Sequence, residues 1–346
     1  MSAANKGEWS EFYVLLKLLA DGEIFNADEN LNRIVTSRRP IIKIFGDDGL
    51  EYRIDRIGNV KIFRDDELRG KISHSEVATD AENFYNAIVN GNGIFEIDGA
   101  DKLMKKFWRD KLKASSRKKS DIKIQVHDIL TGENPVCRYS IKSYLGNAQT
   151  LFNASQATNF KFELPDITAA QISEIHATKK IADKLKLIGD LKFIGVMNKI
   201  FSGNLSLICT SLEKYLAEML KIYYRDGISD CAEIILRMEE NNFMNLNRVD
   251  AYRYKIKKFL CAAALGMTAA VEWNGREDAD NGYIIVKKGG EILAYHLLTR
   301  DTFETYLLNN TRLESPSTSR HNFGKIYVED GKFFMNLNLQ IRFKNL

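Results

Sequence analysis

Residues 121–143 have the sequence DIKIQVHDILTGENPVCRYSIKS, and this stretch decides which fold we expect. The segment 121–128 alternates polar and apolar side chains with a period of two, which is typical of a strand. Residues 131–135, TGENP, have the composition of a turn, and 136–143, VCRYSIKS, predict the returning strand. The stretch therefore predicts a β-hairpin.

The predicted hairpin carries side chains suited to phosphodiester hydrolysis. Ser140 and Lys142 are two residues apart and so face the same side of the sheet, and Asp128 ends the first strand close enough for the turn to bring it there. A carboxylate can hold a hard cation, which stabilises charge on the phosphate and lowers the pKa of bound water. A nearby ammonium adds charge stabilisation. This arrangement resembles the skeleton of the PD-(D/E)xK nucleases.

Each of these residues also has a structural interpretation. Asp128 precedes Thr131-Gly132 and would serve equally to start a turn. Lys142 would also be explained as a solvated lysine of a strand. His127 faces the opposite side by alternation and is interpreted as structural. The hairpin alone therefore leaves the function open.

The first predicted helix begins with a second motif. Residues 8–20 place apolar side chains at helical spacing, and Asp21-Gly22 predicts where the helix ends. The sequence KGEWSE at 6–11 is similar to the K-G-x-x-x-E opening of several PD-(D/E)xK nucleases, archaeal Holliday-junction resolvases among them. In those enzymes a helix glutamate turns into the active site, and Glu11 is the matching residue here.

A longer resemblance runs over most of the chain. Four segments together resemble the HpaII family of type II restriction endonucleases: 6–22, 121–128, 139–160 and 320–343. The most distinctive part is YSIKSYLGNAQTLFNASQATNF at 139–160. The resemblance implies a Mg²⁺-dependent PD-(D/E)xK endonuclease that recognises a short palindrome in duplex DNA, with CCGG as the type sequence of the family.

Ser140 departs from the general nuclease pattern, because most members carry Asp or Glu at this position. A serine hydroxyl is a poor Mg²⁺ ligand beside a carboxylate. We therefore expect Asp128 and Glu11 to hold the metal, with Lys142 and Ser140 completing the catalytic group. Glu163 and Glu133 are weaker candidates for the missing acid.

Three further groups of residues are candidates for DNA contact. Amide side chains follow the second hairpin strand and can bond base edges or phosphates; they are Asn147, Gln149, Asn153, Gln156 and Asn159. The polar stretch 310–325 contains Arg312 and Arg320, and arginine is the commonest reader of guanine. The basic segment 101–119, which ends with Lys118 and Lys119, would contact phosphates. Polar loops and a solvated helix face are the alternatives.

Composition permits this function without demanding it. The chain has 346 residues, a net charge of +4 and four cysteines with no paired spacing. We expect free thiols, a cytoplasmic location and no membrane span. A two-fold symmetric target favours a homodimer, and the resemblance implies a cognate DNA methyltransferase acting on the same site.

The pattern of predicted elements indicates an α+β fold: a PD-(D/E)xK-like mixed sheet flanked by helices, followed by a further helical and β-hairpin region. We expect residues 1–190 to form the nuclease core, with a small β-rich insertion around 40–100 of unassigned role. Residues 191–346 would contribute to DNA recognition. A repair or junction-resolving nuclease, a DNA-binding protein with a degenerate site and a protein that does not bind nucleic acid remain alternatives.

Overall fold

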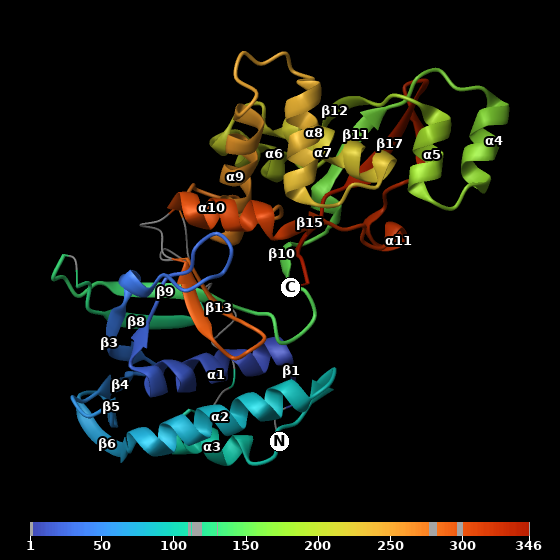
Figure 1. Ribbon diagram of the computed structural model, residues 1–346. Coiled ribbons are helices and arrows are strands. Elements are labelled where there is room, and N and C mark those ends of the chain that lie inside the picture. The colour runs from blue at the N-terminus through green and yellow to red at the C-terminus, as the bar shows by residue number, and fades with distance from the viewer. Residues whose placement is uncertain are drawn as a thin grey trace. The chain divides into compact units, whose positions relative to one another are not determined.

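The computed structural model describes residues 3–109, 112, 120–129, 131–276, 282–295 and 300–345. These residues form an α+β fold, as expected, and divide into two compact units (Figure 1). The first unit takes the described residues of 1–149 and 278–303, and the second takes those of 150–277 and 304–344. The division falls at 149/150 instead of the expected boundary near 190, because later segments return to complete the first unit.

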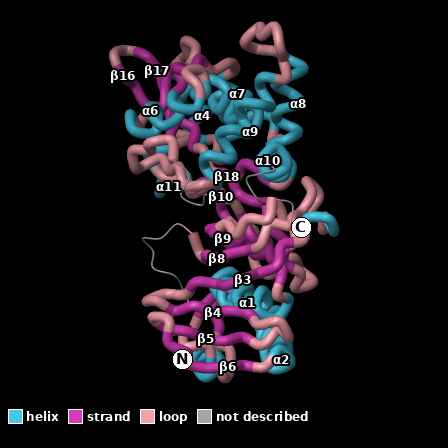
Figure 2. Tube along the Cα trace, turned by 90° about the vertical axis from the view of Figure 1, so that its left-hand side faces the viewer, coloured by secondary structure: helices cyan, strands magenta, loops and turns pink. Residues whose placement is uncertain are grey.

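The first unit is built on a nine-stranded mixed sheet with the order β14-β13-β9-β8-β3-β4-β5-β6, in which β2 also pairs with β3. Its strands are β2 (Glu23–Ile24), β3 (Arg39–Phe45), β4 (Leu50–Ile54), β5 (Val60–Arg64), β6 (Glu67–Ile72), β8 (Ile122–Val126), β9 (Val136–Ser143), β13 (Tyr283–Val286) and β14 (Ile292–Tyr295). Figure 2 shows β9, β8, β3, β4, β5 and β6 as successive neighbours. The predicted β-rich segment after residue 40 is therefore continuous with the sheet of the hairpin.

Helices cover one face of this sheet. They are α1 (Lys6–Asp21), α2 (His74–Asn90) and α3 (Ala100–Lys106). The strand residues Ile124, Ile44 and Ile62 point to this face, are at most 1% exposed, and share one hydrophobic cluster with the helices. Two aromatic contacts of α1 with α2, to the Phe84 ring from Trp9 and Phe12, join the helices to each other. We call this covered side the inner face, and alternate residues of each strand point to the opposite, outer face.

The sequence of residues 282–298, GYIIVKKGGEILAYHLL, predicts a hairpin around a Lys-Lys-Gly-Gly turn. This hairpin is confirmed for β13 and β14, but its partner strand was unforeseen. β13 pairs in parallel with β9, the second strand of the 121–143 hairpin, so Tyr283 lies beside Ser140 and Ile285 beside Lys142. A parallel pair needs a long connection, and here that connection runs through the second unit. The hairpin thus belongs to the first unit, which corrects its assignment to the 191–346 region.

The second unit combines helices with two small sheets, of order β12-β11-β17-β16 and β10-β18-β15. Its helices are α4 (Ala169–Ala177), α5 (Ile181–Ile188), α6 (Lys199–Ile208), α7 (Leu212–Asp226), α8 (Cys231–Asn241), α9 (Ala251–Ala264) and α11 (Thr318–His321), and α10 (Arg300–Asn309) begins in the first unit. Its strands are β10 (Thr150–Phe152), β11 (Asn159–Glu163), β12 (Lys192–Val196), β15 (Thr311–Leu313), β16 (Ile326–Glu329), β17 (Lys332–Asn338) and β18 (Ile341–Phe343). The expected polar loop 310–325 therefore contains a strand and a short helix.

The remaining elements are short. β1 (Ala4–Asn5) pairs with β7 (Ile94–Phe95), and the 3₁₀ turns η1 (Val35–Ser37) and η2 (Gln156–Thr158) connect strands. No helix in the described part of the chain has both the length and the apolar character that crossing a membrane requires. The cysteines, all within the described residues, form no disulfide.

Candidate active site

The hairpin predicted over 121–143 is present, and its register decides which side chains meet. Ile122 of β8 pairs with Tyr139 of β9, so Asp121 lies beside Ser140 at one end of the hairpin. Ile122, Tyr139 and Ile141 are buried on the inner face. By alternation, Asp121, Ser140 and Lys142 share the outer face.

Asp121 is held against β9 by its carboxylate. Its Oδ2 accepts a hydrogen bond from the backbone N–H of Ile141, with a donor–acceptor distance of 2.6 Å. Burial raises the pKa of Asp121, although this hydrogen bond and the charge of Lys142 both act to lower it. A positive charge near this carboxyl group therefore favours its charged form.

Lys142 is the basic residue of this group. Burial lowers its pKa, against the opposing effects of the negative charges of Asp121 and Glu11. Its Nζ also lies 5.3 Å from the centroid of the Tyr283 ring on β13. The charges of Asp121, directly before β8, and of Glu11 on α1 therefore both act on Lys142 of β9.

The start of α1 is packed tightly against β9 and the loop that follows it. Ser10 Oγ and Ser143 Oγ form a buried hydrogen bond of 2.7 Å. A Cβ at Gly7 would lie 3.3 Å from Nε2 of Gln149, and a Cβ at Gly146 would lie 3.2 Å from Cβ of Lys6. Close approach at these glycines fixes the helix turn that carries Glu11 next to the strand that carries Lys142.

Asp128 does not join this group, contrary to our expectation. Its backbone N–H donates to the carbonyl of Glu133 at the other end of the hairpin from Ser140. Glu133 precedes Ser140 by seven residues, and seven residues of extended strand span roughly 23 Å. Its side chain is buried, lies 3.6 Å from Nε of Arg39 and accepts from the N–H of Thr131. Asp128 therefore closes the turn, which was its structural interpretation.

Sequence analysis missed Asp121. The available signal was its place directly before the first strand, because an antiparallel hairpin brings that end beside the far end of the second strand. Ser140 and Lys142 share one side of β9, as their spacing predicted, and Ser140 is 8% exposed. Glu133 lies in the exposed turn and Glu163 in the second unit, bonded to Lys332, so neither belongs to the group.

The amide side chains predicted to bind DNA have different environments. Asn147 is exposed in the loop after β9, and Gln149 is half-buried beside Gly7. Asn153 and Gln156 are exposed in the second unit. Asn159 is buried instead: its side chain donates to the carbonyls of His321 and Asn322 and accepts from Asn338. Asn159 therefore holds β11 in place and is removed from the DNA-contact group.

The arginines and lysines predicted to contact DNA also differ in their environments. Arg320 is exposed on α11, whereas Arg312 on β15 lies 3.3 Å from the Glu314 carboxylate. Lys118 and Lys119 lie outside the described residues.

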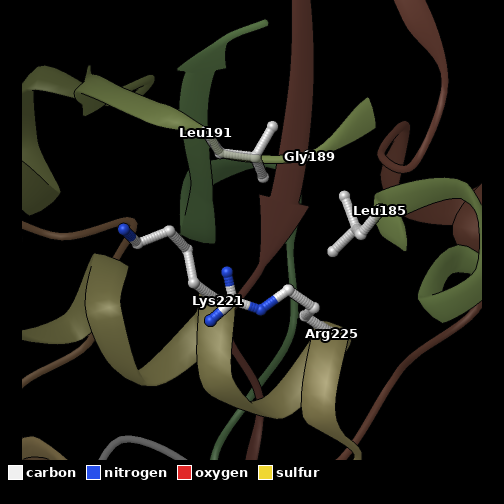
Figure 3. A pocket seen from close by; sticks show the side chains of 5 residues that line it. All are labelled: Leu185, Gly189, Leu191, Lys221 and Arg225. Atoms are coloured by element: carbon white, nitrogen blue, oxygen red, sulfur yellow. The ribbon is translucent and has the colours of Figure 1, made fainter. Parts of the chain in front are cut away.

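A small pocket in the second unit does not offer an alternative site. Figure 3 shows Lys221 and Arg225 of α7 beside Leu185, Gly189 and Leu191. Lys221 pairs with Glu218 at 2.8 Å, and Arg225 pairs with Asp226 at 3.0 Å. Acidic neighbours on the same helix thus already pair with both cations.

The residues around Lys142 suit a hard divalent cation. Mg²⁺ is commonly held by one or two carboxylates, with water filling its other positions. Asp121 and Glu11 could supply oxygen ligands, and the buried Asp121 carboxyl would be favoured in its charged form by a bound cation. No cluster of three or more acidic, histidine or cysteine ligands occurs among the described residues.

Comparison with known proteins identifies the family of the chain. The model of the HpaII restriction endonuclease family matches residues 5–343. The type II restriction enzyme HpaII of Haemophilus parainfluenzae is 40% identical, over 99% of this chain and 98% of its own length. No solved structure matches the chain. A match of this extent, over a hairpin with this geometry, shows that the chain belongs to the HpaII restriction endonuclease family.

Proposed function

We propose that this protein is a type II restriction endonuclease that hydrolyses phosphodiester bonds of double-stranded DNA at a short palindromic site, with Mg²⁺ as its cofactor and CCGG as the expected sequence. The observation that carries the proposal is the register of the 121–143 hairpin, which places Asp121 beside Ser140 on the face that also carries Lys142, with the Asp121 carboxylate bonded to the N–H of Ile141.

Each residue has a defined part in this reaction. Asp121 and Glu11 would hold the metal, which when bound stabilises negative charge on the phosphate and acidifies water. Lys142 places a cation beside the reacting phosphate and orients the attacking water. Water adds to the phosphorus, the bond to the leaving oxygen breaks, and that oxygen takes up a proton. Ser140 supplies a hydroxyl where other nucleases carry a carboxylate, so Glu11 provides the second acid.

Recognition of the DNA would involve Arg320 and the exposed amides Asn147, Asn153 and Gln156, with Arg312 available if DNA displaces its contact with Glu314. A palindromic target favours a homodimer. A methyltransferase of the same specificity would protect the host site.

Ser140 is the one feature that favours the alternative of a DNA-binding protein with a degenerate nuclease site. The test is digestion of unmethylated plasmid DNA with Mg²⁺ by the wild type, Asp121→Asn and Lys142→Ala, followed by sequencing of the fragment ends. We expect discrete fragments with one shared end sequence from the wild type, and a loss of cutting of at least about 100-fold in both variants.

The other outcomes are informative. Cutting that survives both substitutions would show that the catalytic centre lies elsewhere. Binding without cutting by the wild type, under any divalent cation, would favour the degenerate protein. Cutting confined to branched or damaged DNA would favour a repair or junction-resolving nuclease.

A further inference from the structure

The outer face of the sheet carries a row of positive charge that the catalytic group does not use. Lys43 on β3, Arg53 on β4, Lys61 on β5 and Lys71 on β6 occupy directly paired positions across four neighbouring strands. Ile44, Tyr52 and Ile62 alternate with them and are buried on the inner face. The four cations therefore share one face of the sheet.

A second row lies next to the first. Arg138 of β9 pairs with Lys123 of β8, and Lys123 pairs with Phe45 of β3. The Phe45 ring lies between two ammonium groups, with Lys123 Nζ 4.3 Å and Lys43 Nζ 4.7 Å from its centroid. We call the six side chains the cationic face: Lys43, Arg53, Lys61, Lys71, Lys123 and Arg138.

The cationic face adjoins the catalytic group. Asp121, directly before β8, precedes Lys123 by two residues, and Arg138 precedes Ser140 by two residues on β9, so each pair points to the same side. Two residues of strand correspond to about 6–7 Å. The face therefore extends from the catalytic end of the hairpin across β3, β4 and β5 to β6, all within the first unit.

Like charges placed directly opposite each other across strands destabilise a sheet. Glu51 relieves part of this repulsion, since its carboxylate lies 2.8 Å from Nζ of Lys43 and 2.7 Å from a terminal nitrogen of Arg53. Asp66 pairs with Arg53 at 2.7 Å and Asp55 with Lys61 at 3.9 Å. With Arg138 left out of the count, the five other cations face these three acids among the described residues, so the face keeps an excess of positive charge.

Protection of an exposed sheet edge against pairing with another molecule does not explain the first row of cations. Lysines on an edge strand discourage aggregation, and that accounts for Lys71 on β6. β3, β4 and β5 are interior strands, where this protection is unnecessary. An anionic partner would offset the repulsion between all four positions.

We infer that the cationic face binds the phosphate backbone of the duplex DNA substrate beside the bond that is cut. The inference rests on the proposed function. The four β-strands that carry the first row span about 14 Å, because neighbouring β-strands lie about 4.8 Å apart. One strand of B-DNA advances 3.4 Å along the axis per phosphate, so the row covers about four phosphates. This assigns a role to the segment 40–72, for which the sequence offered none.

The test replaces Lys43, Lys61 and Lys71 together by Gln, which leaves the paired Arg53 in place. A matched control replaces Lys179, Lys180 and Lys186 by Gln, which removes the same charge from exposed positions just before and on α5, none of which is proposed to contact DNA. Binding to a fluorescent 30-base-pair duplex carrying one CCGG site is measured without divalent cation between 50 and 300 mM salt, and a single strand of the same sequence is titrated in parallel.

If the face binds duplex backbone, the slope of log K against log salt becomes shallower by about 2.7 in the Lys43/Lys61/Lys71 variant, at about 0.9 per lost phosphate contact, and is unchanged in the control. Its melting temperature changes little, because the substitutions relieve repulsion between the cations but also remove the ion pairs of Lys43 with Glu51 and of Lys61 with Asp55. An unchanged slope, in a wild type that binds and cuts duplex DNA, overturns this inference alone. A loss confined to the single strand also overturns it. A wild type that binds no DNA overturns both this inference and the proposed function.

Discussion

At the scale of single residues, the hairpin contains two aspartates with opposite functions. Asp121 is coupled to Lys142, and burial raises its pKa. Asp128 is 6% exposed and lies 3.6 Å from Arg39, whose side chain is equally enclosed. The two aspartates are seven positions apart, and their different neighbours make Asp121 a candidate catalytic residue and Asp128 a structural one.

Asp128→Asn is expected to reduce the free energy of unfolding by about 3 kcal/mol, because it removes one partner of a buried ion pair. Asp121→Asn is the matched control. Burial raises the pKa of Asp121, so the folded protein tolerates a neutral side chain there, and we expect its stability to be equal or higher. Urea unfolding of both variants measures the difference, and equal loss of stability in the two would contradict these assignments.

Tyr283 positions Lys142 from the neighbouring strand. Its ring is 2% exposed, lies 5.3 Å from Lys142 Nζ and packs edge-on against Phe303 at 5.2 Å. We expect Tyr283→Leu to slow single-turnover cutting about tenfold, which corresponds to a cation–π contact of about 1–2 kcal/mol. Tyr283→Phe keeps the ring and should retain the rate.

The control for this prediction is Tyr295→Leu. Tyr295 pairs across the hairpin with Tyr283 and packs on the same Phe303 ring, but it lies on β14, one strand further than β13 from the strand of Lys142. Its replacement should reduce stability while the cutting rate of the folded protein is retained. Equal rates for Tyr283→Leu and Tyr295→Leu would contradict the positioning role.

At the scale of elements, the β13–β14 hairpin depends on one glycine. Gly290 has a φ of +81°, and a Cβ there would lie 2.9 Å from the hydroxyl of Tyr13 on α1 and 3.0 Å from the ring of Tyr85 on α2. The Tyr13 hydroxyl also donates to the Gly290 carbonyl. The turn is therefore seated against both helices.

Gly290→Ala is expected to cost more than about 1 kcal/mol of stability, because it combines left-handed strain with a steric clash. Gly93→Ala is the control for strain alone, since its φ is +64° and no atom lies within 4 Å of the added Cβ. Thermal unfolding compares the two variants. If Gly290→Ala loses no more stability than Gly93→Ala, the β13–β14 turn does not pack closely against α1 and α2.

At the scale of the whole molecule, metal binding should be visible as stability. A ligand that binds only the native state raises the melting temperature in proportion to its affinity and concentration. We expect Mg²⁺ to raise the melting temperature of the wild type by a few degrees and that of Asp121→Asn by much less. Addition of EDTA should abolish both the shift and the cutting. An equal shift in the two proteins would place the metal away from Asp121.

The sequence by itself determined the local elements and the family. The two-residue period over 121–128 and the turn 131–135 predicted the hairpin, the 6–11 motif marked the helix that carries Glu11, and the 282–298 pattern predicted β13 and β14. Such patterns suffice because alternation and turn composition depend on neighbours along the chain.

Only the tertiary structure decided which side chains meet. The register of β8 against β9 selected Asp121 over Asp128, and the parallel pairing of β13 brought Tyr283 beside Lys142 from more than 130 residues away. The cationic face depends on pairing between four strands, each of which contributes a single lysine or arginine. The physical reason is common to all three: a strand's period states which residues share a face, whereas its partner and register are set by the packing of the whole sheet.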